Sequence, residues 1–289
     1  RWATFEDTRT RGLVANHSVG NFDQCRRTRS AGADREVDLT EQATASYMTR
    51  TWGRLKGALT GFVNEVGAMV QFGVTSIRVS FERPYRYLEI IRHMEFVGNQ
   101  SVFIISLTGL FTGLALSFQV YLGFKMVNAT NLVGPIVALG ITRELGPVLT
   151  GLIVAARAGG AMAARLGTMR VNEQIDALDV MGVNTRQYLI APRIYATIIC
   201  MPLLTAIFDA TAMLGSWFLV VKLVALDEAI FWDKVKAVLE FRHINEGLFK
   251  SAVFGLVFSV ICTYRGFNTQ GGAKGVGEAT NRGVVTSMV

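Results

Sequence analysis

The sequence predicts an all-α integral membrane protein with an N-terminal interfacial amphipathic helix and about five transmembrane helices, the last one truncated. Three observations lead to this fold class. Hydrophobic residues make up 51% of the 289 residues and charged residues only 18%, whereas a soluble domain carries about 25% charged residues. The mean hydropathy is +0.35. Long stretches are free of charge, and one exceeds the roughly 20 residues that cross a bilayer.

The first segment, residues 1–47, is polar and charged and has no sustained helical or strand period. This composition is typical of a solvated tail. The first residue is Arg1, and the first methionine is Met48. Two interpretations are open: a genuine polar extension, or upstream sequence joined to a protein whose natural start is Met48. We favour the second, because the pattern changes abruptly at that methionine.

Residues 48–98 are expected to hold an interfacial amphipathic helix and a cytoplasmic linker. Between Trp52 and Phe81, apolar residues recur close to the 3.6-residue period of a helix. A core-facing helix of a soluble domain would show the same pattern, but no other part of the chain supplies such a domain. We therefore expect this helix to lie in the membrane interface. The segment that follows it is rich in arginine.

Residues 99–289 are expected to form the transmembrane permease domain. Its first span is clear, because no charged residue occurs from Ser101 to Phe124. This span contains the pair Gly109 and Gly113, and a later small-residue segment contains Gly159 and Gly160. Small residues at such spacing allow another helix to approach closely, although glycine is common in membrane helices in general.

The segment from Leu132 to Leu166 is apolar but interrupted. It contains Gly-Pro steps at 134–135 and 146–147 and the adjacent charges Arg143 and Glu144. A charge at the bilayer centre costs roughly 2.5–3.5 kcal/mol on insertion scales, and proline removes a backbone donor. These features predict a broken helix that faces a protein interior or a cavity.

The later spans are less sharply bounded. An apolar run from Ile194 to Leu226 would be roughly 50 Å long as a helix, so it is either one over-long span or two tightly joined spans. A further span is predicted at about Leu248 to Tyr264. Another apolar stretch begins at Gly283 and stops at Val289. We expect the last transmembrane helix to be truncated there.

The loops predict the orientation of the spans. Lys and Arg gather in residues 50–98, 165–193 and 265–282, whereas the loops near 125–131 and 227–245 are nearly balanced or acidic. Because basic loops stay on the cytoplasmic side, we expect a cytoplasmic N-terminus. The same rule explains the net charge of +7, because the basic residues gather in cytoplasmic loops at the membrane surface. We therefore expect no nucleic-acid partner.

The interval 172–182 predicts one short amphipathic helix between two spans. Asn172 is suited to cap its start and Gly182 to end it. One face would carry Ile175, Leu178 and Gly182, and another would carry Glu173, Asp176 and Asp179. Spacing alone leaves two interpretations open, an ordinary solvated connection or a docking element that transmits motion from a soluble partner.

The strings ITRELGPV at 141–148 and NEQIDALDVMG at 172–182 resemble the MlaE (YrbE) permease family of bacterial lipid-transporting ABC systems. The resemblance extends from Met48 to Val289 and includes APRIYATIICMPLL and GGAKGVGEATNRGVV. It implies a homodimeric, multi-pass permease of the bacterial inner membrane that transports phospholipid and contributes to outer-membrane lipid asymmetry. It also implies a cytoplasmic ABC ATPase that binds ATP, a periplasmic MCE-domain protein and, in many of these systems, a STAS-domain subunit.

The resemblance maps an ATPase-coupling helix onto Glu173 to Gly182 and an outward-facing lipid pocket at the dimer axis onto the segment around Arg143. The expected pocket residues are Arg143, Glu144, Leu145, Val148 and Leu149. From the residues alone, the Arg143–Glu144 pair is equally open to a structural role as an ion pair that holds helices together. The extension before Met48 and the acidic Glu278, where the family often has a basic residue, depart from the family pattern.

The sequence predicts a transport subunit rather than an enzyme. It contains no GxxxxGK[ST] loop, so the chain is not the ATPase. Its three histidines are isolated, and we expect no catalytic residue, metal site or cofactor on this chain. A permease for a small solute or an ion-coupled carrier is the alternative function. A non-transporting scaffold is disfavoured by the charged, interrupted segment.

Overall fold

The computed structural model describes residues 57, 60–61, 63–79 and 87–288. The predictions for residues 1–47, for a start at Met48 and for the first part of the linker lie outside these residues. Contacts divide the chain into two units, Arg1–Val66 and Gly67–Val289. In the first unit, residues 57, 60–61 and 63–66 are helical. The description below concerns the second unit, whose described residues contain helices and no strand.

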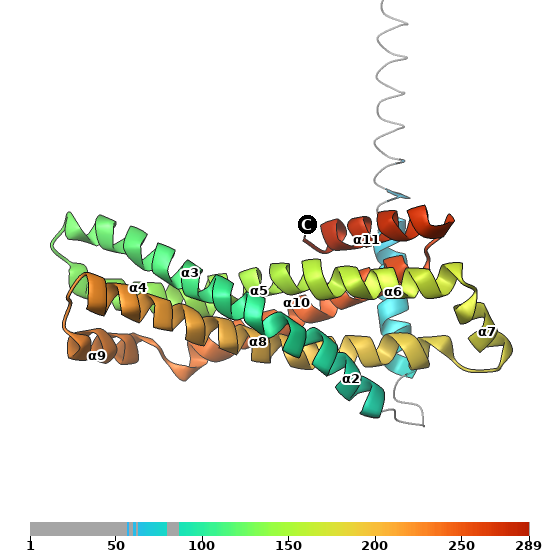
Figure 1. Cartoon of the computed structure of the whole chain (residues 1–289), viewed down its shortest axis with the longest axis horizontal. Coiled ribbons are helices and arrows are strands. Elements are labelled where there is room, and N and C mark those ends of the chain that lie inside the picture. The colour runs from blue at the N-terminus through green and yellow to red at the C-terminus, as the bar shows by residue number, and fades with distance from the viewer. Residues whose placement is uncertain (1–56, 58–59, 62, 80–86, 289) are drawn as a thin grey trace, which may run out of the picture. The chain divides into compact units, whose positions relative to one another are not determined.

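The second unit is a bundle of long helices joined by short ones (Figure 1). In chain order, the elements after residue 79 are α2 (Tyr87–Val97), α3 (Asn99–Lys125), η1 (Thr130–Leu132), α4 (Val133–Gly140), η2 (Ile141–Leu145), α5 (Gly146–Val154), η3 (Ala155–Gly159), α6 (Gly160–Val171), α7 (Gln174–Val180), η4 (Arg186–Ile190), α8 (Ala191–Trp217), η5 (Phe218–Leu223), α9 (Glu228–Val238), α10 (Phe241–Phe267) and α11 (Gly272–Met288). Within this unit, α7 lies at one end of the bundle and α9 at the other (Figure 1).

Four helical segments of the described chain are long and apolar enough to cross a membrane. They are Tyr87–Lys125, Thr130–Val171, Arg186–Leu223 and Phe241–Phe267. The predicted all-α membrane fold is therefore confirmed. The described residues thus hold four such segments instead of the five predicted. Where the truncated fifth span was predicted from Gly283, the structure has α11, a 17-residue helix that starts at Gly272 and is not among the four. The loop predicted up to residue 282 is wrong, because α11 starts at Gly272 and packs on α6 and α10.

The interrupted segment is not a broken helix. The chain stays helical from Thr130 to Val171 and absorbs its irregular residues in two π-helical turns, η2 and η3. Pro147 lies in the first turn of α5, where a missing N–H costs little. The preceding Gly146 N–H still donates to the Ile141 carbonyl oxygen across the wider turn. The helix therefore does not break as predicted, but widens locally into π-helical turns.

The later boundaries also differ from the prediction. The run predicted at Ile194 to Leu226 is one over-long helical segment, Arg186–Leu223. The loop predicted near 227–245 contains α9, which begins where the Asp227 side chain accepts a hydrogen bond of 2.9 Å from the Ala229 N–H. Helix α10 starts at Phe241, several residues before the predicted Leu248.

Glycines set the distance between helices. A Cβ on Gly109 would lie 2.9 Å from the Phe208 carbonyl oxygen, and one on Gly113 would overlap the backbone of Ala212. Helices α3 and α8 therefore meet at their backbones, as close packing between small residues requires. A Cβ on Gly159 would lie 2.8 Å from Cys262 Sγ, and one on Gly160 would lie 3.3 Å from Val284 Cγ2 of α11, both closer than ordinary van der Waals contact.

The helical residues 67–79 have two apolar sides. Phe72 is buried and packs edge-on against Tyr264, with 5.4 Å between ring centroids, and against Phe267 at 5.7 Å. On the other side, Val70 and Val74 are exposed. The helix thus packs on the bundle through one side and exposes valines on another; its position in the membrane interface stays a prediction.

Candidate functional site

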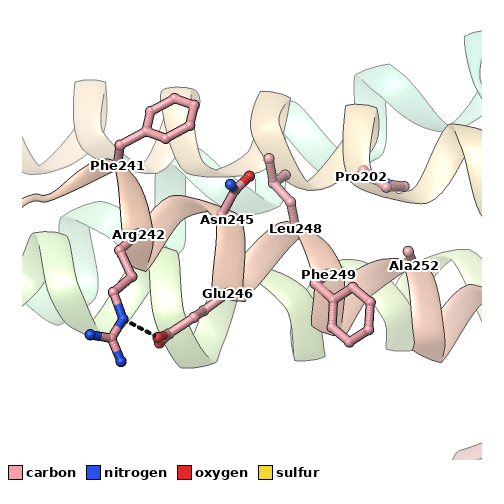
Figure 2. A pocket seen from close by; sticks show the side chains of 8 residues that line it. All are labelled: Pro202, Phe241, Arg242, Asn245, Glu246, Leu248, Phe249 and Ala252. Carbon is pink, nitrogen blue, oxygen red and sulfur yellow. Dashed lines mark hydrogen bonds and ion pairs between the residues drawn. The ribbon is translucent and has the colours of Figure 1, made fainter.

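A groove of about 890 Å³ runs along the first half of α10. It is lined by Pro202, Phe241, Arg242, Asn245, Glu246, Leu248, Phe249 and Ala252 (Figure 2). All but Pro202, which belongs to α8, come from α10. Phe241 and Phe249 are largely exposed, so the groove combines aromatic surface with an arginine, an amide and a carboxylate.

An alternating series of five charges adjoins this groove. Arg242 Nε lies 3.1 Å from Glu246 Oε1 (Figure 2). Arg143 Nε lies 3.7 Å from Glu246 Oε2 and 3.7 Å from Glu144 Oε1. Lys250 Nζ lies 3.0 Å from Glu144 Oε1. The series therefore connects η2 to α10, and its members all keep partial contact with solvent or lipid.

The helices place these charges by simple geometry. Arg242, Glu246 and Lys250 recur every four residues and share one face of α10. Opposite them, the wide turn η2 leaves the Arg143 carbonyl oxygen free to accept a hydrogen bond of 3.1 Å from Lys250 Nζ. A side chain at Gly247 would collide with the Thr142 carbonyl oxygen. The glycine thus allows α10 to approach η2 closely enough for these contacts.

The structure brings only part of the predicted lipid pocket to this groove. None of Arg143, Glu144, Leu145, Val148 and Leu149 lines it. Arg143 reaches it through Glu246, and Val148 is exposed on α5. The Arg143–Glu144 pair is not isolated, because both residues have additional partners on α10. The prediction missed these partners, although the four-residue spacing of Arg242, Glu246 and Lys250 was a visible signal.

The short helix α7 ends in a glycine motif. Gly182 has φ of +74°, its N–H donates to the Asp179 carbonyl oxygen, and the Val183 N–H donates to the Leu178 carbonyl oxygen. This is a Schellman end, as the sequence indicated. The predicted cap at Asn172 is wrong. That residue terminates α6, and the turn between the helices instead places Glu173 at the start of α7 with φ of +57°.

The two faces of α7 have different surroundings. Ile175 is buried in an apolar cluster with residues of α6, η4 and α8, and Leu178 packs at its edge. Asp176 accepts a hydrogen bond of 2.5 Å from Arg170, and Asp179 accepts one of 2.9 Å from Thr185 Oγ1. The predicted acidic face is therefore partly engaged within the chain.

The tip of α7 carries an exposed apolar pair that sequence reasoning missed. Val180 is 89% exposed and Met181 is 67% exposed. Val180 is the last residue of α7, and Met181 is its C-cap, immediately before Gly182. No amphipathic pattern identifies them, because they lie beyond the helical face that buries Ile175. They are large apolar side chains that α7 leaves exposed, beside its exposed polar residues.

The residues that the structure describes contain no group of three or more His, Cys, Asp or Glu side chains suited to hold a metal ion. The described cysteines, Cys200 and Cys262, are buried and free.

Four bilayer-length apolar segments, a charged groove on one of them and a capped helix between two others define a multi-pass α-helical membrane protein. The model of the family described as Permease MlaE matches residues 90–289. The chain belongs to this family, and the resemblance stated above is confirmed.

Curated relatives cover most of the chain. A probable ABC transporter permease protein of Rickettsia typhi is 38% identical over 229 residues, which make up 79% of this chain and 88% of the relative. A probable ABC transporter permease protein of Synechocystis is 39% identical over 69% of this chain and 76% of its own length. The intermembrane phospholipid transport system permease protein MlaE of Haemophilus influenzae is 34% identical over 68% of this chain and 76% of its own length.

Proposed function

We propose that this chain is the permease subunit of an ABC transporter that moves phospholipid between the bacterial inner membrane and a periplasmic MCE-domain carrier. In this role it contributes to outer-membrane lipid asymmetry. The observation that carries the proposal is the groove on α10, which joins exposed aromatic surface to alternating charges. The name of the Haemophilus influenzae relative supports phospholipid as the cargo.

The groove suits an amphiphile with a charged head. Phosphate oxygens accept hydrogen bonds from arginine, and Arg242 and Arg143 flank Glu246, which would face the amine of a zwitterionic head group. The acyl chains would lie along Phe241 and Phe249. Leu145 at the end of η2 and Val148 and Leu149 on α5 would extend the apolar path toward the axis of the homodimer.

The proposed assembly has a cytoplasmic ATPase at α7. That partner binds and hydrolyses ATP, and this chain carries no cofactor. The exposed tip Val180–Met181 provides apolar contact area, and residues Glu173 to Gly182 transmit the motion into α6 and α8 through buried Ile175. A periplasmic MCE-domain protein and a STAS-domain subunit complete the assembly. The N-terminus is cytoplasmic, residues 48–98 form the interfacial helix and linker, and 1–47 form a polar tail.

The test is site-specific photo-crosslinking in the assembled transporter, reconstituted with labelled phospholipid. A photoreactive residue at Phe249 should capture lipid, and ATP turnover should change the yield because the groove empties. Phe103 on α3 is the matched control, since it is equally exposed but lies away from the groove. Its capture of bulk lipid should not respond to ATP. Equal, ATP-independent capture at both positions would contradict a substrate path through the groove. ATP-driven uptake of a soluble solute would favour the alternative function.

A further inference from the structure

Near the α7 end of the bundle, one guanidinium nitrogen of a buried arginine finds no acceptor among the described residues. Arg193 is only 5% exposed, and its Nη1 atom has no hydrogen-bond partner among the described residues. A buried charge without a partner is costly, and buried polar groups in proteins are almost always satisfied. The guanidinium therefore calls for an anionic acceptor that the described residues do not supply.

Two more basic side chains converge on this arginine. Helix α2 runs along α8, where the Cys200 thiol lies 3.5 Å from the Met94 carbonyl oxygen. Next to Met94, His93 lies within the electrostatic range of Arg193 and Arg165. Arg165 of α6 stacks 4.1 Å above the ring of Phe96, one turn further along α2. Three helices thus contribute one basic group each.

The neighbouring charges do not neutralise this cluster, which we call the His93–Arg165–Arg193 cluster. In the described part of the chain, no ion pair joins any of its members to an acid. On α2, Glu89 is already paired with Arg92 at 3.2 Å. By contrast, Arg157 nearby donates to Ser101 Oγ at 2.7 Å and to Gln100 Oε1 at 2.8 Å. The described residues therefore supply acceptors to Arg157 but none to the Nη1 atom of Arg193.

Centring the hydrocarbon core on each span places the cluster at head-group depth. A hydrocarbon core of about 30 Å corresponds to roughly 20 helical residues. Centred on the first, second and third spans, that core covers about residues 96–116, 141–160 and 195–214. His93, Arg165 and Arg193 each fall a few residues beyond it, at the end of the bundle that carries α7. The exposed Arg165 opens the cluster to this layer, and Arg193 forms its floor.

We propose that His93, Arg165 and Arg193 form a binding site for the phosphate of a lipid head group in the leaflet on the α7 side of the membrane. Guanidinium groups bind phosphate through paired hydrogen bonds, and basic pockets between transmembrane helices bind anionic head groups. The site is separate from the α10 groove. It does not depend on the proposed transport function, because occupancy is measured without ATP.

The test is lipid binding to the purified full chain in detergent, measured by native mass spectrometry and by titration with short-chain phosphatidylglycerol. Diacylglycerol of the same chain length lacks the phosphate and should not compete. Arg165→Gln and His93→Gln should each weaken binding roughly tenfold, the effect of losing one charge-assisted hydrogen bond. Arg193→Gln should abolish binding, and Arg193→Lys should retain part of it. Arg170→Gln removes a nearby charge that is paired with Asp176 and should change the affinity by less than about twofold.

Three outcomes would overturn the proposal. Unchanged affinity in Arg165→Gln and His93→Gln would exclude the cluster as the lipid site, and thermal unfolding of these two variants shows whether they are folded. Competition by millimolar inorganic phosphate at the same affinity would assign the cluster to a free anion instead of a lipid. Loss of dimer or complex assembly with unchanged lipid binding would identify the acceptor as a carboxylate of another chain. Crosslinking at Phe249 tests the transport groove alone, and lipid titration of the cluster variants tests the His93–Arg165–Arg193 cluster alone. A failure of one proposal is therefore distinguishable from a failure of the other.

Discussion

Arg143 Nε lies 3.7 Å from Glu246 Oε2, so the π-helical turn η2 is joined to the groove face of α10. Glu246 also holds Arg242 at 3.1 Å, which makes this carboxylate the midpoint between two guanidinium groups. A charged ligand that binds Arg242 or Glu246 in the groove therefore changes the electrostatic environment of Arg143, which belongs to another span, without direct contact. The first prediction follows from that position.

Glu246→Gln should impair transport more than folding. Removing the carboxylate charge leaves Arg143 and Arg242 without their shared acceptor, and transfer of labelled phospholipid to the acceptor protein should fall roughly tenfold. Because the groups are partly exposed, thermal unfolding should change by less than about 1 kcal/mol. Asp233→Asn removes an exposed charge on α9 and serves as the control. Equal transport losses in both variants would contradict a specific role for Glu246.

Met181→Arg should release the ATPase. Met181 is exposed at the tip of α7, so the arginine disturbs no packing within the chain but places a charge in an apolar contact. We expect affinity for the ATPase, measured by titration, to fall roughly tenfold or more, with unchanged thermal unfolding. Val285→Arg on α11 replaces a similarly exposed apolar residue and should leave ATPase affinity intact. Wild-type affinity in Met181→Arg would show that the tip is not the docking surface.

Gly113→Ala should destabilise the bundle. The added Cβ would overlap the Ala212 backbone, and forcing α3 away from α8 should cost about 1–3 kcal/mol. The measurement is denaturant or thermal unfolding in detergent. Gly123→Ala in the same helix meets no atom within 4 Å, so it should be neutral or slightly stabilising. Similar stabilities for the two variants would disprove the close approach at Gly113.

Gly182→Ala should loosen the end of α7. Its φ of +74° costs an alanine roughly 1 kcal/mol. Hydrogen exchange at the N–H groups of Gly182 and Val183 should accelerate by several-fold, with little change elsewhere. Gly140→Ala is the control, because a Cβ there meets no atom within 4 Å and the backbone is helical. Unchanged protection in Gly182→Ala would mean that the Schellman end does not depend on the glycine.

The fold class was predictable because it rests on composition and on uninterrupted apolar length. The helix boundaries were less so. The mixed charges between Asp227 and Asn245 suggested a loop, but Asp227 caps α9, and Arg242 begins a charged face of α10. In the sequence, charged residues four positions apart are equally compatible with a solvated loop and with one face of a helix. The two cases differ only in whether a neighbouring helix supplies partners for the charges, as η2 does here.

The candidate sites show the same limit. The string NEQIDALDVMG was sufficient to predict a short helix and its glycine end, but not its start, because Asn172 ends α6 and Glu173 precedes α7. The sequence did not single out Arg193, since nothing local marks an arginine as buried. Its environment is set by α2 and α6, which lie far away in the sequence. Likewise, Lys250 meets η2 only because Gly247 lets two spans touch.

The wide turns η2 and η3 also fix the rotational phase of the Thr130–Val171 helix. In an α-helix each residue advances by about 100°, so a turn with one additional residue rotates everything after it by about that angle. The same continuous helix can then face α9 through α4, α8 and α10 through α5, and α11 through α6. Deleting a single residue within η2 would turn the whole second half of this helix away from its present neighbours, even if every remaining side chain were preserved. In this segment the number of residues is therefore as much a determinant of the fold as their identity.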